Sequence, residues 1–128
     1  DPKRQAFLNN LEQYQSEVTK LAKARLTDAD QGSIPKNHLM LFDKIITEVE
    51  AAGATPIFIM PPTLLPQASL HQAYAQGKIP YLLSFNNPAK TPALYEISQR
   101  HDSEHLTDPG AQYFTELLAN AFVETLHP

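Results

Sequence analysis

The sequence predicts an α/β fold, in which parallel strands lie between layers of helices. Residues 55–60, TPIFIM, place apolar side chains one after another without alternation, which is typical of a strand covered on both faces. Residues 81–85, YLLSF, form a second predicted strand. Segments with the helical spacing of apolar residues come before, between and after these strands, which favours parallel pairing through right-handed crossovers. At 128 residues the chain fits one domain.

The first predicted helix covers residues 3 to about 25. Its apolar side chains recur every three or four positions and so share one helical face: Phe7, Leu11, Tyr14, Val18 and Leu21. The polar stretch 27–33 then predicts a surface loop.

A second helix is predicted from Ser33 to Ala52. Ser33 supplies a capping hydroxyl, and Pro35 suits the first turn because its fixed φ is helical. Gly53 follows the last turn, where many helices end in a left-handed residue. The side chains predicted to be buried on this helix are Leu39, Phe42, Ile45, Ile46 and Val49.

Prolines and a glycine separate the elements in the centre of the chain. Pro61 and Pro62 end the first strand, so their loop lies at its carboxyl end and is expected to border any cleft there. A short helix over residues 66–76 follows and ends at Gly77. Residues 86–100 predict an irregular crossing with one helical turn near its middle.

The last predicted helix follows the polar turn HDSEHLT. Thr107 or Asp108 caps this helix, and Pro109 lies in its first turn. Its apolar stripe, predicted to pack on the core, consists of Phe114, Leu117, Leu118, Ala121 and Phe122.

Composition excludes several classes of function. The net charge is -4 and the ten basic residues are scattered, so the chain lacks the basic patch that binding to nucleic acid requires. No apolar run approaches the roughly 20 residues that cross a bilayer, so no membrane span is predicted. Without cysteine the chain forms no disulfide and no thiolate metal site.

Asp102 and His105 are the candidate catalytic residues. They lie three apart in the turn before the last helix, where a carboxylate can fix the tautomer of an imidazole and stabilise the imidazolium that forms when the ring takes a proton. Histidine suits proton transfer because its pKa lies near neutral pH. In open α/β sheets active sites lie beyond the carboxyl ends of the strands, close to where this turn is expected.

The block Asp102-Ser103-Glu104-His105-Leu106-Thr107, followed by Gly110-Ala111 and an apolar helix, resembles the C-terminal block of the SGNH (GDSL-type) hydrolases. The segment EVEAAGATPIFIMPPT resembles the helix, strand and loop before that block, and FNNPAKTPALY resembles the branch that acylates cell-surface polymers. The resemblance covers roughly residues 36–126. It implies a three-layer α/β/α, flavodoxin-like fold, His105 as general base, Asp102 as its orienting carboxylate, and no metal or organic cofactor.

The family's serine nucleophile has no counterpart in this chain. In the family it lies in a Gly-Asp-Ser motif after the first strand, and no serine here follows a strand into such a turn: Ser16, Ser33, Ser69, Ser84, Ser98 and Ser103. The oxyanion-hole glycine and asparagine blocks are not recognisable either. Two strands also leave sheet edges uncovered, which native folds avoid.

Residues 1–128 are therefore predicted to be the C-terminal part of a larger domain. Residues 1–34 form its helix and loop, and residues 35–128 form the α/β core with the Asp-x-x-His turn. The resemblance implies part of a serine esterase or acyltransferase that acts on an ester or acylated polymer, and it is compatible with an extracytoplasmic location. The N-terminal part of the same domain, or another chain, would supply the serine and the first strands.

Two alternatives come from other classes of function. His101, Asp102 and His105 cluster within five residues and carry donors that suit zinc, although no further ligand group has matching spacing. A catalytically inactive accessory or binding domain with the same fold would also explain the absent nucleophile. Among the other histidines, His38 and His71 are expected at the surface.

Overall fold

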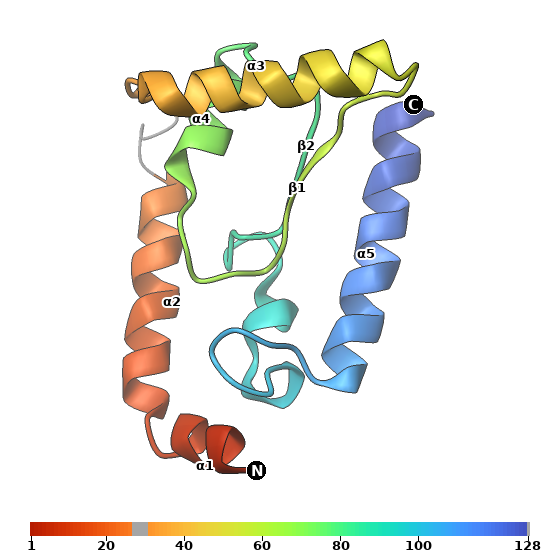
Figure 1. Ribbon diagram of the computed structural model, residues 1–128. Coiled ribbons are helices and arrows are strands. Elements are labelled where there is room, and N and C mark those ends of the chain that lie inside the picture. Colours follow the sequence, from red (N-terminus) through yellow and green to blue (C-terminus); the bar gives the residue numbers. More distant parts are fainter. Residues whose placement is uncertain (27–30, 128) are drawn as a thin grey trace.

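A computed structural model describes residues 1–26 and 31–127, so most of the loop predicted over residues 27–33 lies outside the described part of the chain. The elements in chain order are α1 Pro2–Leu8, α2 Leu11–Leu26, α3 Lys36–Ala51, β1 Phe58–Met60, α4 Ala68–Ala75, β2 Leu82–Ser84, the 3₁₀ turns η2 Pro92–Tyr95 and η3 Ile97–Gln99, and α5 Asp108–Leu126 (Figure 1). None of the described helices is long and apolar enough to cross a bilayer.

The two predicted strands pair in parallel, which confirms the mixed α/β class. Phe58 lies opposite Leu82 and Met60 opposite Ser84. Each strand is shorter than predicted, with three residues. In this register Pro56 and Pro80 lie opposite each other, and neither has the N–H that would extend the ladder.

Helices cover both faces of this small sheet. On one face Leu83 packs in a cluster that reaches α2 and α5; its buried members are Leu21, Leu83, Phe85, Leu94 and Tyr95. On the other face Leu82 and Phe58 pack against a second cluster, formed by α3, α4 and Ile79. Neighbouring residues of β2 thus face opposite layers, as strand geometry requires. Figure 1 shows α3 across one end of the molecule, with α2 and α5 on either side.

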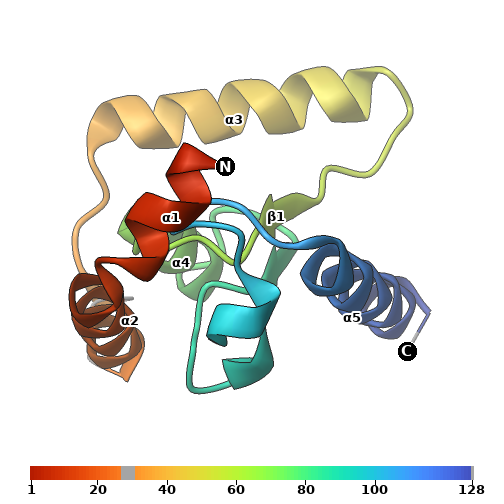
Figure 2. The same cartoon turned by 90° about the horizontal axis from the view of Figure 1, so that it is seen from below.

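The predicted first helix is broken into two, which corrects the prediction of one helix over residues 3–25. The backbone N–H of Asn9 closes α1 on Gln5, and α2 starts at Leu11. Asparagine competes with helical hydrogen bonding, and an edge-to-face contact between the rings of Phe7 and Tyr14, 5.0 Å between centroids, packs across the bend. The bend brings α1 across the turn before α5, as Figure 2 shows from below.

The ends of the later helices agree only in part with the predictions. Gly53 has a φ of 79°, as expected after α3. Ser33 does not cap that helix, because Pro35 occupies the N-cap position without a side-chain hydrogen bond. Thr107, not Asp108, caps α5 by accepting from the N–H of Gly110.

Apolar side chains remain exposed along the outer edge of β1, although helices pack on both faces of the sheet. Ile59 keeps 46% of its surface, and Ile45 of α3 is also exposed although it was predicted to be buried. Phe122 of α5, the last residue of the predicted buried stripe, is exposed as well. No described strand pairs with the outer edge of β1, and the exposed side chains of Ile45 and Ile59 lie beside that edge.

Candidate active site

The turn that carries Asp102 and His105 is closed by backbone hydrogen bonds at its base. Arg100 and Leu106 form an antiparallel bridge, and the N–H of His101 donates to the carbonyl of His105 at 2.9 Å. The N–H of Thr107 donates to the carbonyl of Gln99, also at 2.9 Å. The residues between these bonds therefore form a short loop with a fixed base.

The carboxylate of Asp102 organises this loop from within. Its Oδ1 accepts hydrogen bonds from the backbone N–H groups of Glu104 and His105, each at 2.8 Å. Aspartate in a turn commonly binds backbone groups two or three residues further along. The side chain is only 14% exposed, so it is fixed against the loop that it closes.

The same carboxylate contacts the imidazole of His105. Nδ1 of the ring lies 2.9 Å from Oδ1 and 3.1 Å from Oδ2 of Asp102. A carboxylate can only accept here, so Nδ1 carries the proton and Nε2 is the basic nitrogen of the neutral ring. The His105 side chain is 62% exposed, and Nε2 has no hydrogen-bond partner among the described residues. The structure thus brings together the two residues that the sequence singled out.

The environment of Asp102 favours its ionised form. Burial alone raises the pKa of the carboxyl group, but hydrogen bonds outweigh that effect. The donors are the N–H of Glu104, the ring of His105 and the N–H of His105, and together they hold the pKa of Asp102 below its ordinary value. An ionised carboxylate at this position can stabilise an imidazolium at His105.

Close packing at position 110 explains why a glycine follows this turn. Its backbone packs so closely against Gln99 that a Cβ at this position would overlap the Gln99 carbonyl oxygen. That same oxygen accepts the Thr107 N–H, and the Thr107 hydroxyl donates to the carbonyl of Ser98 at 3.2 Å. The start of α5, the 3₁₀ turn η3 and the base of the loop are therefore packed as one unit.

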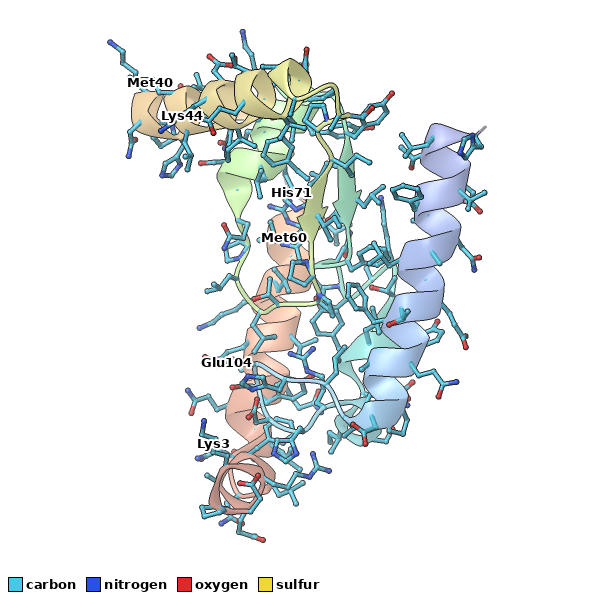
Figure 3. All side chains as sticks on the ribbon, turned by 45° about the vertical axis from the view of Figure 1, so that its right-hand side comes forward. Lys3, Met40, Lys44, Met60, His71 and Glu104 are labelled. Carbon is cyan, nitrogen blue, oxygen red and sulfur yellow. The ribbon has the colours of Figure 1, made fainter. Side chains whose placement is uncertain are left out.

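Two cavities lie against the loop. One, of about 370 Å³, lies between the loop and helices α1 and α2, and both Asp102 and His105 line it. The other, of about 670 Å³, lies between α2, the loop and the segment after β1, where Thr63 to Pro66 line it. The segment that follows Pro61 and Pro62 thus borders a cleft, as predicted. Figure 3 shows Glu104, which lines both cavities, beyond the end of the strand that carries Met60.

His101 points away from the pair and does not complete a metal site. Its Nε2 lies 2.9 Å from Oδ2 of Asp1, whereas His105 contacts Asp102. Over residues 1–26 and 31–127, no group of three histidine or acidic side chains is arranged to hold a metal ion. The zinc alternative considered from the sequence therefore has no support in the structure.

A second serine–histidine contact, not anticipated from the sequence, lies at the end of β2. His71, predicted at the surface, is half-buried, with its Nε2 2.8 Å from Oδ1 of Asn86. The Ser84 hydroxyl donates to the same oxygen at 2.9 Å and lies 3.4 Å from Nε2. Because Asn86 donates its amide to Leu65 and Pro66, its Oδ1 accepts from both neighbours, and Nε2 of His71 carries a proton. This nitrogen therefore cannot take a proton from Ser84, which excludes the usual serine–base pairing.

Comparisons with protein-family models, with curated proteins and with solved structures gave no match for this chain. The relationship to the SGNH hydrolases therefore stays a prediction from the sequence.

Proposed function

We propose that this chain is the C-terminal part of a serine esterase or acyltransferase of the SGNH type, with a flavodoxin-like fold. Asp102 and His105 would be two members of a Ser-His-Asp triad whose serine lies outside residues 1–128. The contact between the Asp102 carboxylate and Nδ1 of His105 carries this proposal, because it leaves Nε2 basic and open beside a cavity.

In the completed site, Nε2 of His105 takes the proton of the serine hydroxyl as the serine oxygen bonds to the ester carbonyl carbon. Asp102 stabilises the resulting imidazolium through Nδ1. The bond to the leaving alcohol breaks as Nε2 returns the proton to its oxygen, which leaves an acyl-serine. Water or an acceptor hydroxyl then gives its proton to Nε2 and attacks the acyl group. The serine oxygen leaves and regains that proton, and the product is an acid or a new ester.

The described part of the chain offers no nucleophile for this reaction. None of its serine hydroxyls contacts the ring of His105, and Ser84 lies in a separate network with His71 and Asn86. The accessory-domain alternative shares this feature. What favours the catalytic proposal is the contact of Asp102 with the His105 ring, since the turn that Asp102 closes needs the carboxylate but not the imidazole.

The free edge of β1 is the surface on which the rest of the domain would dock. Phe58 and Met60 direct their backbone groups to β2, so alternation turns those of Ile59 to the other side, where no described strand pairs with them. A groove of about 400 Å³ runs beside this edge between α3 and β1, with Ile45, Val49 and Ile57 among its lining residues. A further parallel strand from the N-terminal part of the domain would pair with Ile59 and fill this groove.

The test is to read the coding sequence upstream of Asp1 and to express the longest domain that it encodes. We expect a strand followed by Gly-Asp-Ser, and hydrolysis of a chromogenic ester by the purified domain. His105→Ala should lower kcat by about 10⁶, the scale seen when a triad loses its base. The exposed His127 at the end of α5 provides the matched control, His127→Ala, which should retain activity.

Two results would contradict the proposal. One is wild-type turnover in a folded His105→Ala domain. The other is an upstream sequence without a Gly-Asp-Ser segment, together with absence of esterase activity in the full protein. The second result would favour the accessory domain, whose function would then be binding.

A further inference from the structure

Arg100 is the charged side chain that is most deeply buried among the described residues. None of its surface is exposed, and no described carboxylate lies within ion-pair distance of its guanidinium group. Burying a cation without an acidic partner is costly, so hydrogen bonds must compensate for the lost water. Because Arg100 lies two residues before Asp102, these hydrogen bonds affect the conformation of the loop that carries Asp102 and His105.

The guanidinium group bonds to backbone carbonyls from three separate segments. Nη1 donates to the carbonyl of Pro62 at 2.7 Å and, more weakly, to that of Leu94 at 3.4 Å. Nη2 donates to the carbonyl of Ser103 at 2.7 Å. The guanidinium group of Arg100 thus joins the segment after β1, the turn η2 and the loop that carries Asp102 and His105.

The ring of Tyr95 packs against that group. The guanidinium carbon lies 5.3 Å from the ring centroid, a favourable cation–π distance. The Tyr95 hydroxyl in turn shares its one proton between the carbonyls of Phe85 and Thr63, at 3.0 and 3.1 Å. Arg100 is therefore supported by a side chain that is itself anchored to the end of β2 and to the segment after β1.

Of the bonds that Arg100 makes, the one to Ser103 bears directly on the candidate site. Ser103 lies between Asp102 and His105, and its carbonyl is drawn inward towards Arg100 while the histidine ring stays at the surface. Without that bond the loop keeps the hydrogen bonds at its base, but its tip is held only by the Asp102 carboxylate. The carboxylate–imidazole geometry depends on that tip, because the Oδ1 of Asp102 that contacts the His105 ring also accepts from the backbone N–H groups of Glu104 and His105.

We propose that Arg100 is the positioning residue of the Asp102–His105 pair. It acts through the loop backbone and touches neither the substrate nor the reacting atoms. Its consequence for turnover rests on the function proposed above, but its effect on the pair does not.

The isolated chain can test this proposal with ¹⁵N-labelled histidine and NMR. At a pH at which the ring of His105 is neutral, it should show the Nδ1–H tautomer in the wild type. Arg100→Met keeps a long apolar side chain but removes every donor. We expect it to shift the ring to the Nε2–H tautomer, which a free neutral imidazole prefers.

A matched control separates positioning from general loss of stability. Tyr95→Phe removes the hydroxyl that bonds to Phe85 and Thr63, yet keeps the ring against Arg100. It should lower stability without changing the His105 tautomer. Arg100→Lys keeps the charge but can no longer bridge three segments, so it should retain only part of the Nδ1–H population. If the methionine variant does not fold, the lysine variant alone tests whether Arg100 positions the pair.

A folded Arg100→Met or Arg100→Lys chain whose His105 ring stays in the Nδ1–H tautomer would overturn the proposal. In the completed domain Arg100→Met should lower kcat much more than it raises KM, towards the roughly 10⁴-fold loss that follows a wrong tautomer. The two proposals fail separately. If His105→Ala retains turnover while the tautomer still depends on Arg100, only the catalytic function is wrong.

Discussion

The carboxyl end of β1 and the outer edge of the same strand differ sharply in how many contacts surround them. Beyond its carboxyl end, the loop around Asp102 is held by its base, by the Asp102 carboxylate and by Arg100. Along its outer edge, Ile59 presents an unpaired backbone and a half-exposed apolar side chain. The chain thus holds a carboxylate–imidazole pair on a fixed loop, beside a sheet whose β1 edge is unpaired among the described residues. The proposed division of a triad between two parts of a domain would account for both features.

The largest effect expected from this comparison is a loss of turnover on changing Asp102, in the loop beyond the carboxyl end of β1. In the completed domain, Asp102→Asn should lower kcat by about 10⁴, because an amide can donate to Nδ1 and hold the ring in the wrong tautomer. Asp108→Asn, an exposed change in the first turn of α5, is the matched control and should retain activity. Ester hydrolysis at neutral pH measures both variants. Equal turnover for the two would remove Asp102 from the site.

At the open edge, Ile59→Lys should affect the isolated chain and the completed domain in opposite ways. In the isolated chain the charge lies on a half-exposed surface, so stability should change little and self-association should decrease. In the completed domain the same lysine would be buried without a partner and should cost about 3–5 kcal/mol. Tyr74→Lys, an exposed change on α4, is the control. Urea unfolding and sedimentation measure these effects, and equal destabilisation of both forms would contradict docking at this edge.

The packing beneath the loop predicts a smaller effect on stability. Gly110→Ala should destabilise the chain by about 1–3 kcal/mol, because the new methyl group overlaps the carbonyl oxygen of Gln99. Ala111→Ser, one residue later on an exposed position of α5, should change the urea midpoint much less. If the two variants unfold at the same midpoint, the close approach at Gly110 is not important for the fold.

The smallest effect is the dependence of stability on pH. Because the pKa of Asp102 is lowered in the folded chain, its ionised form stabilises the fold above the unfolded value of about 3.9. That contribution is lost as the pH falls through the lower folded pKa. Asp102→Asn cannot ionise, so the stability difference between wild type and variant should shrink over this acidic range. A constant difference between neutral pH and the folded pKa would contradict the hydrogen bonding assigned to Asp102.

Sequence patterns predicted the parts of the molecule that depend on neighbouring residues. Apolar spacing located the helices and both strands, and Asp102 and His105 could be found because turn chemistry acts over three residues. The bend at Asn9 was missed, since the apolar pattern continues through it while the contact of Phe7 with Tyr14 stabilises a break.

Arg100 was missed for a different reason. Its carbonyl partners are Pro62, Leu94 and Ser103, which are backbone groups brought together only by the fold. An arginine beside a polar turn is usually solvated, so the sequence carries no signal of its complete burial. The exposure of Ile59 could not be predicted either, because an unbroken apolar run indicates that a strand is buried but does not identify the residues that bury it.

Covalent labelling with a fluorophosphonate tests the division of the triad most directly. This reagent reacts with serines that a neighbouring base has activated. We expect no labelling of residues 1–128 alone, labelling of a single serine upstream of Asp1 in the completed domain, and loss of that labelling in His105→Ala. Labelling of a serine within residues 1–128, or persistence of the labelling in His105→Ala, would contradict a triad divided in this way.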